Sequence, residues 1–127
     1  MNTAVDYMYR DASNYKLRDR RVFPGEITAA ERDAIIAHLD GDPIVDVDSY
    51  LDGYFIPAQL GWEHLAADGD WNFPDEDNHP WHELTGIEPT GARPTEYETI
   101  HEFVTRFCAI TKWRDDLPAN ATPEDAA

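Results

Sequence analysis

Two histidines three positions apart carry the side chains best suited to metal chemistry. His79 and His82 are separated by Pro80 and Trp81, and Glu83 follows directly. Imidazole and carboxylate groups this close, with further acids just upstream, could hold a divalent ion and support a small metal-dependent enzyme. However, Pro80 favours an extended His79, and on a strand His82 and Glu83 point to opposite faces. We therefore expect a loop-to-strand junction in which His82 hydrogen-bonds the backbone, with no metal and no cofactor.

Two acidic segments have part of the pattern of a calcium-binding loop. In the segment that begins at Asp48, Tyr50 stands where an acidic ligand belongs, and Gln59 replaces the final bidentate glutamate. In the segment that begins at Asp68, Phe73 replaces the glycine of the turn. We expect both segments to be acidic turns.

The sequence also lacks the common catalytic motifs. It has no glycine-rich nucleotide-binding loop, no nucleophile-elbow serine and no paired cysteines. Cys108 is the single cysteine and lies on the apolar face of an expected helix, which favours a small core residue over a nucleophile. The sequence predicts a protein that is not an enzyme.

Charge is distributed very unevenly along the chain. The formal net charge is −16, and no lysine or arginine lies between Arg32 and Arg93. A surface of this kind repels nucleic acid and attracts the proteins that bind it. The stretch 33–92 holds fourteen carboxylates: Asp33, Asp40, Asp42, Asp46, Asp48, Asp52, Glu63, Asp68, Asp70, Asp75, Glu76, Asp77, Glu83 and Glu88.

We expect this acidic stretch to bind a basic, nucleic-acid-binding protein of the host, such as a CRISPR effector. Asp46 with Asp48 on a strand, and Glu98 with Glu102 on a helix, would present charge at roughly 6 to 7 Å, comparable with successive phosphates. An aromatic residue in the stretch could act as an apolar anchor. The expected partner-binding residues are Asp40, Asp42, Asp46, Asp48, Asp52, Asp68, Asp70, Trp71, Phe73, Asp75, Glu76 and Asp77.

A small basic patch precedes the acidic stretch. Lys16, Arg18, Arg20 and Arg21 lie on an expected strand over 15–23, with Tyr15 turned inward. On a chain of this net charge, we interpret the patch as an internal counter-charge to the acidic middle. We expect the protein to bind neither nucleic acid nor a membrane directly.

The elements that must position these residues follow from apolar periodicity. Alternation over 5–9 and 15–23 predicts a hairpin, and 81–88 is predicted to be a strand. Residues 44–48 are expected to form a strand or an extended acidic loop, and 54–56 a short buried apolar run, so this region supplies one or two strands. Two stretches have helical spacing. The order of these strands and helices along the chain predicts an α+β fold. It would consist of a mostly antiparallel sheet of three to five strands with two amphipathic helices packed on one face.

Each expected helix begins at a capping box. Thr28 and Glu31 open a helix that runs to about Leu39, with an apolar stripe led by Ala30. Thr95 and Glu98 open a second that runs to about residue 113, with an apolar face of Tyr97, Ile100, Val104, Phe107 and Cys108. A short helix is expected over 58–65.

The length predicts a single domain over 1–114, followed by a flexible acidic tail over 115–127. We expect no membrane span and no signal peptide, because the chain has no apolar run long enough for either. With a single cysteine, these features predict a cytoplasmic protein.

Three stretches together resemble a family of small acidic proteins that phages, plasmids and other mobile elements of bacteria carry. They are residues 11–16 (DASNYK), residues 54–61 (YFIPAQLG), and residues 79–84 (HPWHEL) with 87–90 (IEPT). The resemblance spans about residues 7 to 113. The family has no assigned activity, so the resemblance implies no site residue. It implies a mobile-element context, in which small acidic proteins include inhibitors of host defence such as anti-CRISPR and anti-restriction proteins.

Together these observations predict a non-enzymatic, DNA-mimic-like inhibitor of a host nucleic-acid-binding defence complex. Two alternatives remain open. The acidity could reflect a salt-adapted or mobile-element proteome, in which case it serves solvation only. The chain could also be a small metal-binding protein that uses His79 and His82.

Overall fold

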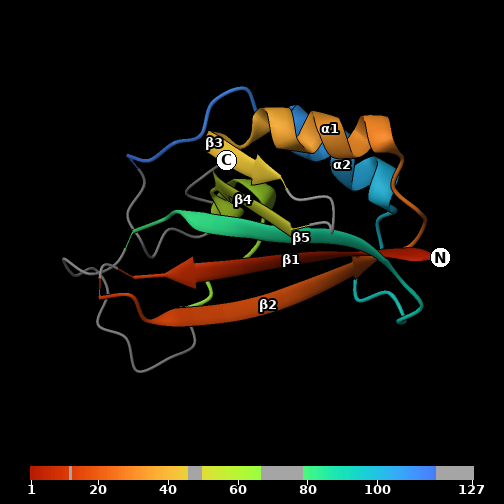
Figure 1. The fold of residues 1–127 in the computed structure, drawn as a ribbon, viewed down its shortest axis with the longest axis horizontal. Coiled ribbons are helices and arrows are strands. Elements are labelled where there is room, and N and C mark those ends of the chain that lie inside the picture. The colour runs from red at the N-terminus through yellow and green to blue at the C-terminus, as the bar shows by residue number, and fades with distance from the viewer. Residues whose placement is uncertain (12, 46–49, 67–78, 117–127) are drawn as a thin grey trace.

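Five strands form one antiparallel sheet covered on one side by two helices (Figure 1). The computed structural model describes residues 1–11, 13–45, 50–66 and 79–116, and only the backbone of 42–45 and 50–52. The strand order is β2-β1-β5-β4-β3. This arrangement confirms the predicted α+β class. The strands are β1 (Asn2–Arg10), β2 (Lys16–Phe23), β3 (Asp40–Val45), β4 (Tyr50–Phe55) and β5 (His82–Thr90), and the helices are α1 (Ala29–His38) and α2 (Ile100–Cys108).

The first two strands form the predicted hairpin. Asp11 closes its turn twice: its backbone N–H donates to the Tyr15 carbonyl at 3.1 Å, and its Oδ1 accepts from the Tyr15 N–H at 2.8 Å. Asn14 provides the left-handed residue of the turn, at φ 67°. The inward placement of Tyr15 is wrong, because the strand starts one residue later and 64% of Tyr15 is exposed.

The alternation of β1 also holds, and it divides the sheet into two faces. Val5 and Tyr7 lie on the face that packs against the helices and belong to the main core cluster. Asp6 lies between them on the opposite face, directly across from Arg20 of β2. By the same alternation Arg21 lies on the helix side and not with the other basic residues of β2. The expected basic face therefore loses Arg21.

Helix α1 begins at the predicted capping box. The Glu31 N–H donates to Thr28 Oγ1 at 3.1 Å, and the Thr28 N–H donates to the Glu31 carboxylate at 3.0 Å. Ile35 is buried, but Ala30 is exposed, so the expected stripe starts later than predicted. The helix ends at His38, and the chain passes at once into β3.

The predicted start of the second helix is wrong by four residues. Thr95 does not cap it: Thr95 Oγ1 accepts the Val22 N–H at 2.8 Å, and the Thr95 N–H donates to the Val22 carbonyl at 2.8 Å. The chain is therefore held extended against the end of β2 and turns into a helix only after Thr99. Thr99 and Glu102 form the actual capping box. Tyr97 lies outside the helix and is fully exposed, which contradicts its predicted place on the apolar face.

Aromatic side chains fill the space between sheet and helices. Trp62 stacks on Phe103 of α2 with ring centroids 5.3 Å apart, and Phe103 stacks on Phe23 of β2 at 4.5 Å. Trp62 follows a single 3-10 turn, η1 (Pro57–Leu60), which replaces the short helix predicted over 58–65. The turn ends at Gly61 with φ 80°, and this left-handed residue directs the chain into the core.

Candidate functional site

Most residues of the expected partner-binding surface lie outside the part of the chain that the structure describes. This holds for Asp46, Asp48, Asp68, Asp70, Trp71, Phe73, Asp75, Glu76 and Asp77, and for nearly all of the acidic turn expected from Asp68. The turn expected from Asp48 is wrong, because the chain forms the strand β4 from Tyr50 onward. Asp40 is described and exposed, and for Asp42 and Asp52 the backbone path is known. These three belong to one antiparallel hairpin, since β3 pairs with β4 and Ile44 lies opposite Asp52. β3 is also an outermost strand of the sheet.

The sheet is electrically asymmetric. The three strands β2, β1 and β5 carry five cations and four carboxylates, which are Arg10, Lys16, Arg18, Arg20, Arg21, Asp6, Asp19, Glu83 and Glu88. The hairpin of β3 and β4 carries Asp40, Asp42 and Asp52 and no lysine or arginine. The negative charge of the sheet is therefore concentrated at its β3 edge.

On the balanced side, arginines already contact carboxylates. Arg20 contacts Asp6 at 2.7 Å and Glu88 at 2.6 Å, and Arg10 contacts Glu83 at 3.3 Å. Glu83 and Glu88 belong to the acidic stretch 33–92, so part of the basic patch acts as the predicted counter-charge.

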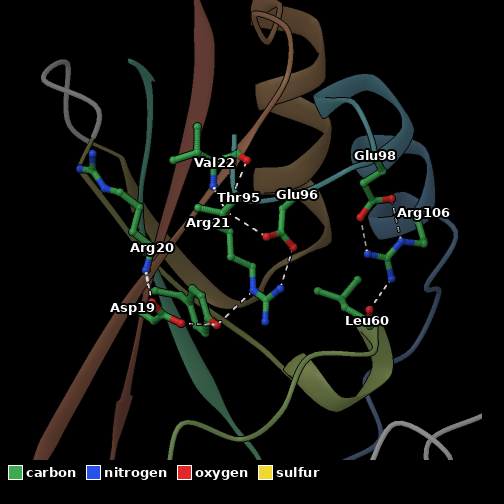
Figure 2. Close-up of polar contacts among 10 residues, drawn as sticks. Asp19, Arg20, Arg21, Val22, Leu60, Thr95, Glu96, Glu98 and Arg106 are labelled. Atoms are coloured by element: carbon green, nitrogen blue, oxygen red, sulfur yellow. Dashed lines mark hydrogen bonds and ion pairs between the residues drawn. The ribbon is translucent and has the colours of Figure 1, made fainter. Parts of the chain in front are cut away.

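Arg21 forms a more enclosed contact that sequence reasoning missed (Figure 2). Its guanidinium carbon lies 4.3 Å from the ring centroid of Trp62, and its Nη1 donates to Glu96 Oε1 at 2.7 Å. Its Nε donates to the hydroxyl of Tyr7 at 3.3 Å. Burial opposes the charge of Arg21, but the Tyr7 and Glu96 contacts raise its pKa above the ordinary value. An indole face, a tyrosine hydroxyl and a carboxylate thus surround this permanently charged guanidinium.

A second arginine, Arg106, links α2 to the 3-10 turn η1 (Figure 2). Arg106 donates to both oxygens of Glu98, at 2.6 and 3.2 Å, and also to the carbonyl of Leu60. Glu98 precedes the helix, so it cannot form the predicted i, i+4 pair with Glu102. The Glu98 charge is instead neutralised inside the molecule, and the phosphate-like spacing expected here is not formed.

His79 and His82 both form hydrogen bonds with backbone groups. His82 Nε2 accepts the Leu65 N–H at 3.2 Å and Nδ1 donates to the Pro80 carbonyl at 3.2 Å, which confirms the predicted hydrogen bonding of His82. His79 Nε2 donates to the Arg10 carbonyl at 2.7 Å, and its Nδ1 accepts the Trp81 N–H. With both ring nitrogens engaged, neither imidazole presents a lone pair to an ion. Within the described ranges, no group of three or more acidic, histidine or cysteine side chains is arranged to hold a metal.

A third histidine, His64, completes this cluster. Its ring lies 4.7 Å from that of His82, and both rings contact Tyr9, at 4.2 and 5.1 Å between centroids. Burial lowers the pKa of His64, and burial followed by the proximity of His64 lowers the pKa of His82 much further. Both are therefore neutral at pH 7. No residue spacing in the sequence indicated His64, because its partners are backbone groups.

Cys108 packs partly buried against the core, and burial raises the pKa of its thiol. A protonated thiol is a poor nucleophile, in agreement with the predicted core role.

Two tryptophans line a groove at the β3 edge, which we call the tryptophan groove. Its volume is about 650 Å³. Trp81 and Trp113 contribute indole surface, while Asp40 and Asp115 are exposed carboxylates in its lining. The sequence predicted Asp40 as a binding residue but gave no indication that Trp81 and Trp113 would lie beside it.

Comparison of the chain with protein-family models, with curated proteins and with solved structures finds no match. In the described part of the chain, no helix combines the length and apolarity needed to cross a membrane.

Proposed function

We propose that this protein is a non-enzymatic, DNA-mimic-like inhibitor that binds a basic, nucleic-acid-binding protein of a host defence complex. It would occupy the partner's cationic nucleic-acid channel with carboxylates. The observation that supports the proposal is a shortage of cations: the chain has too few lysines and arginines to pair with most carboxylates of the acidic stretch.

Of the fourteen carboxylates in 33–92, two contact arginines within the described part of the chain, Glu83 and Glu88. Twelve remain. In the same part, five cations have no carboxylate within ion-pair distance: Lys16, Arg18, Arg32, Arg93 and Lys112. Even if each of these five neutralised one further acid, seven of the twelve would still depend on solvent ions or a partner.

Seven of these twelve acids lie in the segments 46–49 and 67–78, which contain no lysine, arginine or histidine. An excess of one sign on one side of a protein attracts partners of the opposite sign and speeds their association. Because exposed charges are screened beyond about 8 to 10 Å at physiological ionic strength, binding should weaken as salt is added.

The test is capture of host proteins followed by charge variants. Affinity capture with mass spectrometry should recover a nucleic-acid-binding protein, and recovery only of proteins without such a role would contradict the proposal. Asp46→Asn alone should have a small effect, because a distributed field loses little from one exposed charge. Combined neutralisation of Asp40, Asp42, Asp46, Asp48 and Asp52, or of Asp68, Asp70, Asp75, Glu76 and Asp77, should weaken binding far more.

Circular dichroism and a thermal melt would establish that both combined variants remain folded. Their stability should be unchanged or higher, because removing like charges reduces self-repulsion. If both bind the captured partner as tightly as wild type, the acidic stretch serves solvation only.

A further inference from the structure

The tryptophan groove lies where the acidic edge of the sheet meets both helices. It is bounded by the C-terminal end of α1, the start of β3 and the segment that follows α2, with Leu39 and Ile110 in its lining. Its volume of about 650 Å³ falls within the roughly 300 to 1,000 Å³ typical of specific binding sites.

The groove is built from fixed side chains. Trp113 Nε1 donates to the His38 carbonyl at 2.7 Å, and its ring packs edge-on against Phe107 at 5.4 Å. Gln59 holds the same segment at two points: its Nε2 donates to the Lys112 carbonyl at 3.1 Å, and its Oε1 accepts the Arg114 N–H at 2.7 Å. A partner would therefore find a preformed site, which lowers the entropic cost of binding.

The molecule itself shows what such a combination of side chains can hold. The indole face of Trp62 and the carboxylate of Glu96 enclose the guanidinium of Arg21, and Figure 2 shows its contact with Glu96. The tryptophan groove offers the same two elements, indoles from Trp81 and Trp113 and carboxylates from Asp40 and Asp115, but no arginine of this chain lines it.

We propose that the tryptophan groove binds an arginine side chain of the basic partner. This inference rests on the proposed function and identifies where the partner would be anchored. The planar guanidinium stacks on indole and forms bidentate contacts with carboxylates, whereas the lysine ammonium is a compact, strongly hydrated point charge. The net charge of −16 favours a cationic occupant over an anionic one.

Two other groups in the lining bear on this choice. Lys112 is exposed and would repel an arginine, so its removal should strengthen binding. His38 is turned back on its own helix, since its Nδ1 lies 2.8 Å from the Ala34 carbonyl. Lys112 is thus the one lysine or arginine among the described lining residues, and its substitution tests the charge requirement directly.

The experiment titrates the protein with an oligoarginine peptide and, separately, with an oligolysine peptide of equal length. Nitrogen-15 NMR follows the indole signals, which Trp81→Phe and Trp113→Phe variants assign. We expect oligoarginine to shift the Trp81 and Trp113 signals and to bind more tightly than oligolysine. Equal binding of both peptides, or no shift at these two indoles, would overturn the inference. So would shifts that depend on protein concentration alone, which would indicate a second copy in the groove.

Variants with equal changes in net charge distinguish binding at the tryptophan groove from attraction by the overall negative charge of the protein. Asp40→Asn with Asp115→Asn should weaken oligoarginine binding about tenfold, because two exposed ion pairs would be lost. Asp33→Asn with Glu63→Gln changes the net charge equally at exposed positions outside the groove and should have a much smaller effect. In the opposite direction, Lys112→Glu should tighten binding more than Lys16→Glu. If the paired variants behave alike, only the diffuse field binds, and the arginine site is refuted.

The failure of this inference differs from failure of the proposed function. If the variant with Asp40→Asn and Asp115→Asn binds a captured nucleic-acid-binding protein with wild-type affinity, the groove is not the anchor, but the proposed function is retained. If wild type captures no such protein, the function itself fails.

Discussion

Acidification should destabilise the fold through two buried histidines. Between about pH 6.5 and pH 5, the ordinary histidine titrates while carboxylates remain ionised. His82 Nε2 and His64 Nδ1 each accept a backbone N–H, so protonation at either nitrogen would set two donors against each other. His82 is 1% exposed, and His64 is 6% exposed. A cation at either position would also be desolvated.

The sign follows from the direction of both shifts. In the folded protein the pKa of each histidine lies below the unfolded value of about 6.5, so the unfolded state takes up protons first. The stabilising contribution is complete above the unfolded pKa and is lost as the pH falls toward the folded pKa. Each histidine can remove up to about 1.4 kcal/mol of stability per pH unit in that window, and the two together up to about 2.8 kcal/mol. A typical domain has only about 5 to 15 kcal/mol in total.

The assay is urea unfolding at a series of pH values across this window. We expect the free energy of unfolding to fall with a slope of between one and two protons, because the pKa of His82 is lowered much further than that of His64. His64→Gln and His82→Gln should each be less stable near pH 7.5, because a backbone N–H loses its acceptor, but each should reduce the slope, and His82→Gln should reduce it more. A stability that does not change across the window would refute the reasoning, as would a wild-type slope in both variants.

Two further predictions test the fold that positions the site. Thr99→Ala should destabilise the protein by about 1 kcal/mol through loss of the α2 cap, measured by thermal unfolding. Thr105→Ala, at an exposed position of the same helix, should cost less. Gly53→Ala should cost about 1 to 3 kcal/mol, because an added Cβ would lie 2.7 Å from Leu39 Cδ1. Gly91→Ala, where a Cβ meets open space, is the matched control, and equal stability of the two alanine variants would contradict the packing around Leu39.

Local sequence patterns were sufficient where local interactions decide the structure. The alternation of β1 and the capping box at Thr28 depend on residues within a few positions of one another, and both were predicted. The box at Thr95 has the same letters, but Thr95 bonds to Val22, 73 positions earlier in the chain. No short-range pattern contains that contact. Tyr97 was misplaced for the same reason, because its helical spacing matters only if the helix starts where the pattern suggests.

For the expected binding surface, the sequence indicated which residues are acidic but not how they are arranged or paired. The acidic stretch is evident in the sequence, but which of its charges are neutralised depends on pairs such as Arg20 with Glu88 and Arg10 with Glu83, 68 and 73 positions apart. The tryptophan groove likewise unites Trp81, Trp113 and Asp40 from separate elements. Such sites exist only once the sheet register and the helix packing are established.

The strand order determines which carboxylates lie near arginines and which do not. Because β5 enters the sheet between β1 and β4, Glu83 and Glu88 come within reach of Arg10 and Arg20, and their charge is neutralised internally. β3 is two strands further from β1 and has no cation on its neighbour β4, so Asp40 gains no such partner within the sheet. Residues 46–49, which connect these two strands in sequence, contain two more acids. The proposed cationic partner would therefore be attracted toward the same edge at which the tryptophan groove lies, so that the long-range attraction and the proposed arginine contact would favour the same approach.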